Sequence, residues 1–352
     1  MTPISARVPS VGSMTVPSRL VDRSPQVPPQ ALIAGLVPPP LFGGVRFETY
    51  RPDPAEPTQA AALGALRGFA VSLQRPAPRG RWRRRRATGG APRGVYLDGG
   101  FGVGKTHLLA SLWHAAPGPK AYATFVELTH LAGALGFAAV VEALGGMRLL
   151  AIDEFELDDP GDTVLVSTLL ARLAERGVAL AATSNTLPDR LGEERFAAED
   201  FLREIQGLAA RFTAVRVDGP DYRHRGLPQA PAPLRDDEVR ERAQATPGAT
   251  LDSFDELTTH LARLHPSRYG ALVDGVTAVH LTGVHTAVDQ AAALRLVVFA
   301  DRLYDREIPV VGSGAPFDRL FDADMLSGGY RKKYRRAISR LVALNRTGVG
   351  VG

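Results

Sequence analysis

The most regular feature of the chain is an alternation of short apolar runs with longer amphipathic stretches after residue 92. Four apolar runs are of buried-strand type and cover residues 95–97, 122–128, 147–155 and 178–184. The first stretch between them places Leu108, Leu109 and Leu112 at the spacing of one helix face. Because apolar strands that alternate with helices are typical of a parallel sheet covered on both faces, the sequence predicts an α/β fold.

Proline separates this region from the start of the chain. Nine of the 27 prolines fall within the first 40 residues, and proline disrupts both helices and central strands. We therefore expect residues 1–44 to be largely disordered and residues 45–226 to form the main domain. Residues 227–235 contain three more prolines and predict a linker. Residues 236–352 then predict a smaller α+β module that ends in a basic helix.

Composition and charge narrow the classes of protein. The 352 residues are 45% apolar and contain no cysteine, which excludes disulfides, zinc–thiolate sites and cysteine nucleophiles. An insert at residues 79–86 contains six arginines, and seven Lys or Arg but no Asp or Glu follow residue 324. Such segments are typical of contact with anionic partners. For the insert, a solvated loop without a partner is an equal alternative.

The sequence predicts neither a membrane span nor a secretory signal. The longest uncharged apolar stretch near a helix, residues 131–141, is shorter than the roughly 18 residues that a span needs. The first 30 residues lack a continuous apolar region. We therefore expect a cytoplasmic protein.

A glycine-rich motif follows the first predicted strand and opens the next predicted helix. It fits G-x-x-x-x-G-K-T and consists of Gly99, Gly100, Phe101, Gly102, Val103, Gly104, Lys105 and Thr106. Glycines let successive backbone N–H groups face a phosphate, and the N-terminus of the helix adds positive potential. Lys105 would reach the β- and γ-phosphates, and Thr106 would offer a hydroxyl to Mg²⁺. The motif therefore predicts a P-loop that binds ATP.

Two acids follow the third apolar run, at the end of a predicted strand. Ligands bind at the carboxyl ends of the strands in open α/β sheets. We therefore assign Asp153 to the Mg²⁺ shell and Glu154 to the general base that polarises the attacking water. Without the P-loop, a strand end that caps the next helix would be the better interpretation.

A polar residue also follows the fourth apolar run. Asn185 follows this run directly, and an amide there can contact the γ-phosphate or the attacking water. It is therefore a candidate sensor of the bound nucleotide, although asparagine is also an ordinary turn residue.

These motifs, in this order, resemble the AAA+ ATPase core, and the flanking sequence resembles the ZapE/Afg-like family of AAA+ ATPases. The matching segments are IDEF at 152–155, ATSN at 182–185, VDGPDYR at 217–223, DRLYD at 301–305 and RAISRL at 336–341. The resemblance covers about residues 47–344. It implies a Mg²⁺-dependent ATPase that forms a homo-oligomer, with residues 236–352 as a lid-like module.

The resemblance also implies a cellular role and partners. Bacterial members associate with the division apparatus and its FtsZ polymer, and organellar relatives act in membrane-protein turnover. Expected partners are therefore FtsZ or envelope proteins, with recruitment to the division site or to a membrane surface. The alternative is a nucleic-acid-associated ATPase of helicase-loader type, in which the two basic segments contact phosphates.

Three arginines are candidates for contact with the nucleotide from outside the P-loop. By the resemblance, Arg295 would touch a phosphate from the lid-like module. The arginine finger is where this chain departs from the family pattern, because acidic residues and alanine directly precede the Phe-Leu pair at 201–202. Arg211 and Arg195 are equal candidates for that role.

Overall fold

The computed structural model describes residues 16–74, 94–100, 102–156, 160–186, 207, 209–219 and 228–350. The chain divides into two compact units. One unit contains residues 26–226, and we call it the core unit. The other contains residues 1–25 together with residues 227–352, and we call it the C-terminal unit.

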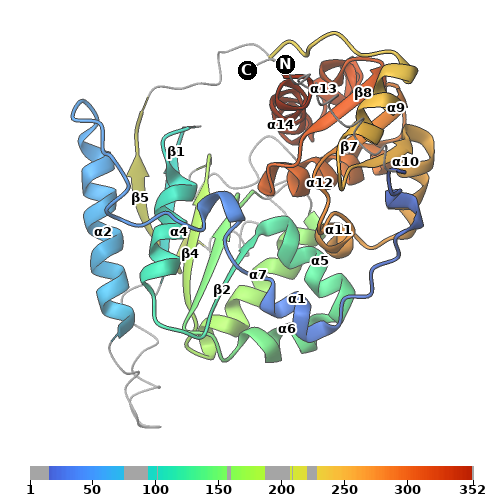
Figure 1. The fold of residues 1–352 in the computed structure, drawn as a ribbon. Coiled ribbons are helices and arrows are strands. Elements are labelled where there is room, and N and C mark those ends of the chain that lie inside the picture. Colours follow the sequence, from blue (N-terminus) through green and yellow to red (C-terminus); the bar gives the residue numbers. More distant parts are fainter. Residues whose placement is uncertain are drawn as a thin grey trace, which may run out of the picture. The chain divides into compact units, whose positions relative to one another are not determined.

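The core unit is built on a five-stranded parallel sheet (Figure 1). Its strands are β1 (Gly94–Gly99), β2 (Lys120–Thr124), β3 (Leu149–Asp153), β4 (Ala179–Ser184) and β5 (Thr213–Val217), in the spatial order β2-β3-β4-β1-β5. Every residue of β1, β3 and β4 is buried. The prediction of a parallel sheet with apolar strands is therefore confirmed.

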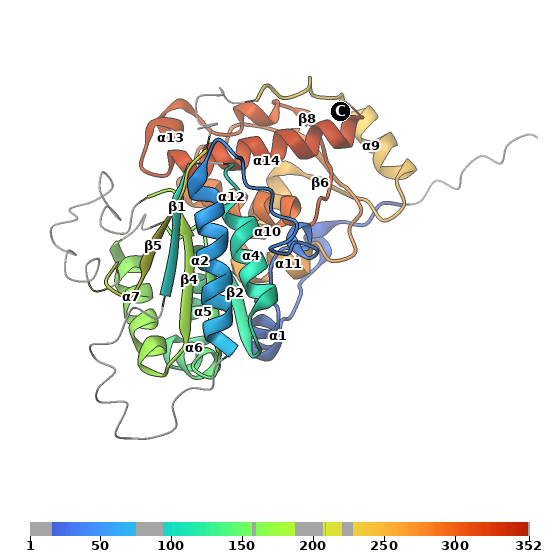
Figure 2. The same cartoon turned by 90° about the vertical axis from the view of Figure 1, so that its left-hand side faces the viewer.

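Helices cover both faces of this sheet, as the alternation of side chains requires. On one face, Val95 and Leu97 of β1 pack in a core with α2 (Pro57–Gln74) and α4 (Lys105–Ala115). On the other face, Tyr96 packs in a core with α5 (Phe125–Leu135), α6 (Phe137–Leu144) and α7 (Pro160–Glu175). Figure 2 shows α2 and α4 side by side along the sheet.

The second predicted strand ends earlier than expected. We expected it to cover residues 122–128, but β2 ends at Thr124 and α5 begins at Phe125. Thr124 Oγ1 accepts a hydrogen bond from the Glu127 N–H (3.2 Å), and the Glu127 carboxylate accepts one from the Thr124 N–H (2.7 Å). This capping box starts the helix, and its T-x-x-E signal was present in the sequence.

The proline-rich start of the chain is a second correction. Residues 1–15 lie outside the described residues, but residues 16–44 are ordered where we expected disorder. They form α1 (Pro29–Ala34) and two short 3₁₀ helices, η1 (Leu20–Asp22) and η2 (Pro40–Phe42). Proline is tolerated in a first helical turn, and the segment buries Leu20 in one unit and Leu36 in the other.

The C-terminal unit has a three-stranded parallel sheet in the order β6-β7-β8. The strands are β6 (Thr250–Ser253), β7 (Val279–Val284) and β8 (Val310–Gly314), and the helices are α9 (Asp236–Ala245), α10 (Phe254–Arg263), α11 (Tyr269–Leu272), α12 (Gln290–Asp305), α13 (Ala323–Ser327) and α14 (Arg331–Val349). Two 3₁₀ helices, η7 (Pro266–Arg268) and η8 (Phe317–Arg319), complete it. The predicted linker runs along this sheet, where Leu234 forms a bridge with Ser313.

The start of the chain is fixed to this unit by a buried carboxylate. Asp252 of β6 accepts hydrogen bonds from the N–H groups of Leu20 (2.9 Å) and Val21 (3.2 Å). Burial raises the pKa of Asp252, and the two N–H groups oppose this rise. Ser18 also forms a parallel bridge with Thr250. Residues 18–22 therefore extend the C-terminal unit.

In the described part of the chain, no single helix is long and apolar enough to cross a membrane. The consecutive helices α5 and α6 pass that test of length and composition only as a pair, and they are bent by 118°.

Candidate active site

The P-loop connects β1 to α4 as the sequence predicts. Gly104 precedes α4 with φ +88°, a left-handed conformation that other residues rarely adopt. A Cβ at this position would also lie 2.6 Å from the Tyr50 ring. No side chain caps the N-terminus of α4, so its first backbone N–H groups suit an anion. Of the motif, Phe101 lies outside the described residues.

Lys105 brings the P-loop and the fourth strand together. Its Nζ donates to the carbonyl oxygens of Gly99 (2.8 Å) and Gly100 (2.5 Å) and to Asn185 Oδ1 (2.9 Å). The contact is possible because β1 and β4 are neighbours in register, with Asp98 opposite Ser184. The structure therefore places Asn185 directly at the amine that we expected to bind phosphate.

Asp153 lies at the carboxyl end of β3 and is 6% exposed. Its Oδ1 accepts hydrogen bonds from the hydroxyls of Thr106 (3.3 Å) and Thr183, and its Oδ2 accepts one from Tyr122 (2.9 Å). Burial raises the pKa of Tyr122 well above its ordinary value, and the nearby charge of Asp153 adds to this effect. The phenol therefore stays protonated and donates to the carboxylate.

Thr106 and Asp153 together suit a magnesium ion. Both offer hard oxygen atoms, which are the ligands that Mg²⁺ prefers. In the part of the chain that the structure describes, no three His, Cys, Asp or Glu side chains group as a metal site. A site of one hydroxyl and one carboxylate agrees with the way Mg²⁺ is bound beside nucleotide phosphates, which together with water supply its other ligands.

Glu154 marks a sharp turn of the chain after β3. Its φ is +53°, a value that costs free energy for a residue with a Cβ. Its N–H donates to Asp153 Oδ1 (3.1 Å) and Thr183 Oγ1 (3.1 Å). The next N–H, from Phe155, donates to the Thr183 carbonyl (2.7 Å) and resumes the contact with β4. The turn leaves the Glu154 side chain partly exposed at the carboxyl end of β3.

Glu156 is a site residue that the sequence analysis missed. Its carboxylate accepts hydrogen bonds from Ser184 Oγ (3.1 Å), the Asn185 N–H (3.0 Å) and Thr186 Oγ1 (3.2 Å). Nothing in the spacing of these residues indicates this arrangement, because it depends on the register between the ends of β3 and β4.

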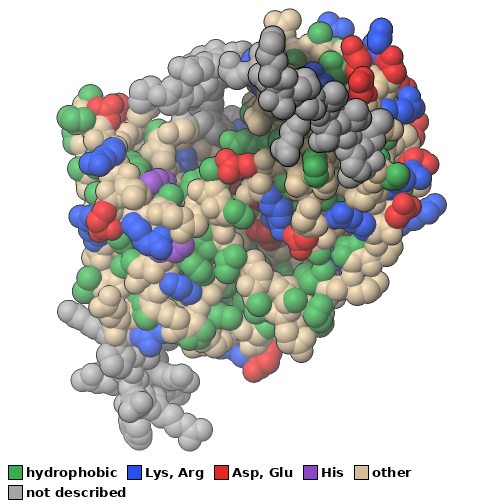
Figure 3. Space-filling model, viewed as in Figure 1, with side chains coloured by type: hydrophobic (Ala, Val, Ile, Leu, Met, Phe, Trp, Pro, Cys, Tyr) green, Lys and Arg blue, Asp and Glu red, His purple; other side chains and the backbone are tan. Residues whose placement is uncertain are grey.

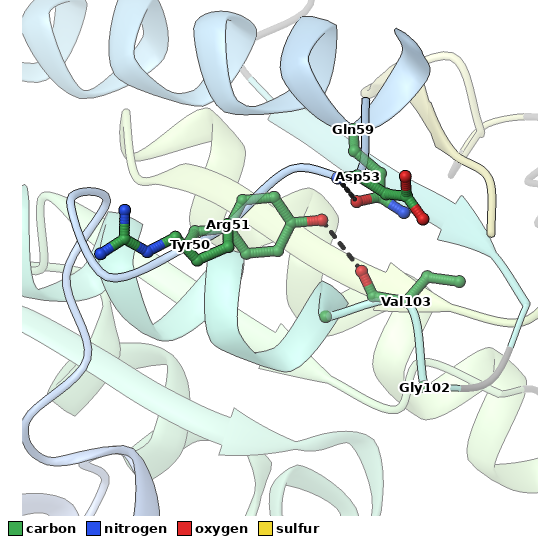
Figure 4. A pocket seen from close by; sticks show the side chains of 7 residues that line it. Tyr50, Arg51, Asp53, Gln59, Gly102 and Val103 are labelled. Carbon is green, nitrogen blue, oxygen red and sulfur yellow. Dashed lines mark hydrogen bonds between the residues drawn. The ribbon is translucent and has the colours of Figure 1, made fainter. Parts of the chain in front are cut away.

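A cavity of about 230 Å³ borders the P-loop (Figure 4). Tyr50, Arg51, Asp53 and Gln59 line it together with residues 102–104. Tyr50 donates its hydroxyl to the carbonyl of Val103 (2.9 Å), and Gln59 accepts from the Asp53 N–H (2.9 Å). The segment before α2 therefore forms one wall beside the phosphate loop, which the sequence analysis also missed.

A second cavity, of about 640 Å³, lies in the core unit away from these residues. It is mainly apolar and is lined by α1, α5 and α6 and by the residues around β2, including Ile33, Leu36, Lys120, Leu135 and Met147. Figure 3 shows hydrophobic side chains gathered on the face that these helices present. None of the predicted site residues lines it.

The three arginines that we proposed to contact the nucleotide lie in different parts of the chain. Arg211 is half-buried and lies in the turn that leads into β5. Arg195 and the arginine-rich insert at 79–86 lie outside the described residues. Arg295 lies on α12 of the C-terminal unit, half-buried and close enough to oppose the rise that burial causes in the pKa of Tyr269.

The parallel sheet, the strand–glycine loop–helix unit with Lys105 and Thr106, and the acidic end of β3 define a P-loop ATPase. The chain belongs to the AFG1-like ATPase family, whose model matches residues 26–245 and 231–349. It is therefore an ATP hydrolase built on a parallel α/β sheet.

Individual relatives extend this comparison. The chain is 28% identical over 348 residues to the cell division protein ZapE of Escherichia coli strain K12. The alignment covers 83% of this chain and 91% of that protein. It is 29% identical over 153 residues to an uncharacterized protein of Schizosaccharomyces pombe, over 38% of this chain and 34% of that protein.

Two solved structures are similar at lower levels. The DnaC helicase loader is 15% identical with a TM-score of 0.35, over 51% of this chain and 99% of that one. The replication initiator DnaA, bound to AMPPCP and single-stranded DNA, is 12% identical with a TM-score of 0.38, over 87% and 91% of the two chains.

Proposed function

We propose that this ATPase couples Mg²⁺-dependent hydrolysis of ATP to the remodelling of a protein partner in cell division or in membrane-protein quality control. The observation that carries the proposal is the similarity to the cell division protein ZapE, which extends over 83% of this chain and 91% of that protein. A likeness over nearly the full length of the relative includes the C-terminal unit as well as the ATPase site.

In this proposal the residues of the core unit divide the work of hydrolysis. Lys105 and the N-terminus of α4 bind the β- and γ-phosphates, and Thr106 and Asp153 hold the Mg²⁺. When bound, the ion neutralises charge that develops on the phosphate oxygens. Glu154 accepts the proton of the attacking water. Asn185 contacts the γ-phosphate or that water.

The cavity beside the P-loop is proposed to receive the nucleoside end of ATP. Its wall contains a tyrosine ring, Tyr50, beside Gly104 of the phosphate loop. An aromatic ring and a few backbone polar groups suit a flat base. Burial also raises the pKa of Tyr50, so its hydroxyl keeps its hydrogen bond to Val103.

Arginines complete the proposed site in a homo-oligomer. We propose that Arg211 or Arg195 acts as the arginine finger toward a neighbouring copy, and that Arg295 contacts the nucleotide from the C-terminal unit. An arginine finger contributes about 10³–10⁵ in rate in GTPase systems. The Ala variant of the true finger should therefore bind ATP and hydrolyse it far more slowly, and unchanged hydrolysis in both single variants would reject both residues.

The test of the partner is a pull-down with Glu154→Gln protein held in ATP, because a variant blocked in hydrolysis retains its partner. ATP-dependent recovery of FtsZ or envelope proteins, unaffected by nuclease, is the expected result. The matched control is Lys105→Ala, which should not recover them because it does not hold the nucleotide.

The alternative is a nucleic-acid-associated ATPase, and the cations at the start of α14 favour it. Arg331, Lys332, Lys333 and Arg335 lie in the first two turns of this helix without an intervening acid. Recovery that nuclease abolishes, together with strongly salt-dependent binding, would support this alternative and reject the protein partner.

A further inference from the structure

Glu156 lies two residues beyond Glu154 and holds the end of the neighbouring strand. Its Oε1 accepts from Ser184 Oγ and from the Asn185 N–H, and its Oε2 accepts from Thr186 Oγ1. A carboxylate is a stronger acceptor than a neutral oxygen. One side chain therefore fixes three consecutive residues at the point where β4 leaves the sheet.

Strand β1 holds the same segment from its other side. The hydroxyl of Tyr96 donates to the carbonyl oxygen of Thr186 (2.7 Å). The ring of Tyr96 is fully buried and packs edge to face on the rings of Phe155 and Phe212, with ring centroids 6.3 Å and 5.6 Å apart. With the main chain fixed on both sides, the Asn185 side chain has a defined direction, toward Lys105 Nζ (2.9 Å).

We propose that Glu156 is a positioning residue for ATP hydrolysis, which holds Asn185 in place and ties it to the segment that carries Glu154. This inference rests on the proposed function, in which Asn185 contacts the γ-phosphate or the attacking water. Displacement of a positioning group by about 1 Å can cost about 100-fold in rate. The contact also gives a route by which a movement after β3 would displace Asn185.

The test compares Glu156→Ala with Glu156→Gln in steady-state ATP hydrolysis by the full chain. We expect Glu156→Ala to lower kcat about tenfold or more while KM for ATP changes less than about threefold, because the P-loop contacts remain. Glutamine keeps the Oε1 acceptor, and its amide can donate to Thr186 Oγ1, so kcat should return to within about threefold of wild type. An unchanged kcat in Glu156→Ala, or a Glu156→Gln as slow as it, would overturn the proposal.

A double variant tests whether Glu156 acts through Asn185. We expect Glu156→Ala combined with Asn185→Ala to have the kcat of Asn185→Ala alone, within about twofold, because the side chain to be positioned is gone. Losses that multiply would overturn this route. The matched control is Glu142→Ala, which removes an exposed carboxylate of the same unit that pairs with Arg176 (2.9 Å) and should leave kcat unchanged.

Thermal unfolding curves identify a variant that fails to fold. If Glu156→Ala does so, Ser184→Ala and Thr186→Val each remove one donor to the carboxylate, and each should lower kcat about threefold with KM unchanged. An unchanged kcat in both would reject the proposal. The same assay includes wild type and Glu154→Gln: turnover that requires Glu154 but not Glu156 rejects this inference alone, whereas no turnover in wild type rejects the proposed function itself.

Discussion

Two carboxylates that are largely shielded from water, one in each unit, have partners of opposite kinds. Asp153 in the core unit accepts hydrogen bonds from the hydroxyls of Thr183 and Tyr122, which are neutral groups. Asp301 on α12 of the C-terminal unit is instead bound by two guanidinium groups of α14, from Arg336 (2.9 Å) and Arg340. Both side chains are largely shielded from water, and of these two, in the described part of the chain, only Asp301 forms ion pairs with arginines.

This difference in partners indicates different roles: Asp301 stabilises the fold, whereas Asp153 is available to bind a cation. Burial alone would raise the pKa of Asp301, but the two guanidinium groups outweigh burial and lower it. The pairs therefore stabilise the packing of α12 on α14. Hydrogen bonds from neutral hydroxyls orient Asp153 without cancelling its charge, which suits a carboxylate that must bind a cation.

The largest expected effect follows from neutralising Asp153. Asp153→Asn keeps the size of the side chain and an acceptor for Thr183, so the thermal midpoint should change little. ATP hydrolysis at saturating Mg²⁺ should fall at least about 100-fold, because the charge that holds the ion is lost. Hydrolysis within a few-fold of wild type would show that the two carboxylates do not differ in role.

The matching change in the C-terminal unit should affect stability and not chemistry. Asp301→Asn removes the negative charge that pairs with the guanidinium groups of Arg336 and Arg340, and we expect a loss of about 3 kcal/mol in the free energy of unfolding of that unit. Because the pKa of Asp301 is lowered, this contribution is present above the ordinary Asp pKa of about 3.9 and is lost as pH falls through the folded value. Urea unfolding of wild type and variant at pH 7 and at pH 3 measures the free energy of unfolding at each pH. A difference between the two proteins that does not shrink from pH 7 to pH 3 would contradict the assignment.

A buried base extends the comparison to neutral pH. Burial lowers the pKa of His280 on β7 from 6.5 to about 4, and the charge of Arg242 adds to this shift. Protonation is therefore easier in the unfolded chain, so stability should fall as pH drops below about 6.5, by about 2 kcal/mol at pH 5. Hydrogen exchange of the β7 amides between pH 5 and pH 7 measures this loss of stability. In His280→Gln the stability should no longer depend on pH over this range, and a dependence that remains would contradict the assignment to His280.

The smallest expected effect concerns one donor to Asp153. Tyr122→Phe removes the hydroxyl that contacts Oδ2 and keeps the buried ring, so the fold should be retained. We expect the apparent affinity for Mg²⁺ in the ATPase assay to fall about tenfold, the lower end of the roughly 10–100-fold that groups orienting metal ligands contribute, because the hydroxyls of Thr106 and Thr183 still hold Oδ1. A Thr183→Val variant provides the corresponding test at Oδ1. Unchanged Mg²⁺ dependence in both would mean that the hydroxyls serve packing alone.

The sequence predicted those parts of the fold and site that depend on local spacing. The P-loop, Asp153, Glu154 and the apolar strands all follow from residues close together in the chain, and their positions in the core unit agree with the prediction. The roles of these residues in hydrolysis remain proposals. Asn185 was predicted from its place after a strand, and its contact with Lys105 follows from the order of β1 and β4.

The remaining site residues could not be predicted because their contacts depend on register and on distant segments. Tyr122 reaches Asp153 only because β2 and β3 pair with Thr124 opposite Asp153. Tyr50 meets the P-loop from a segment about fifty residues earlier in the chain. The order of residues 16–44 was missed for a related reason: prolines obscure a segment that is held by tertiary contacts rather than by its own helix or strand propensity.

The division of the chain also sets an order of events during its synthesis. Leu20 and its backbone N–H belong to a unit whose binding carboxylate, Asp252, is made more than 200 residues later. At about 5–20 residues per second, a ribosome needs roughly 10–50 s to reach that residue. Every residue of the core unit is therefore made before Asp252, and until then Leu20 lacks the residues that bury it in the finished fold. We therefore expect residues 18–22 to take their place in the C-terminal unit only after β6 has been made.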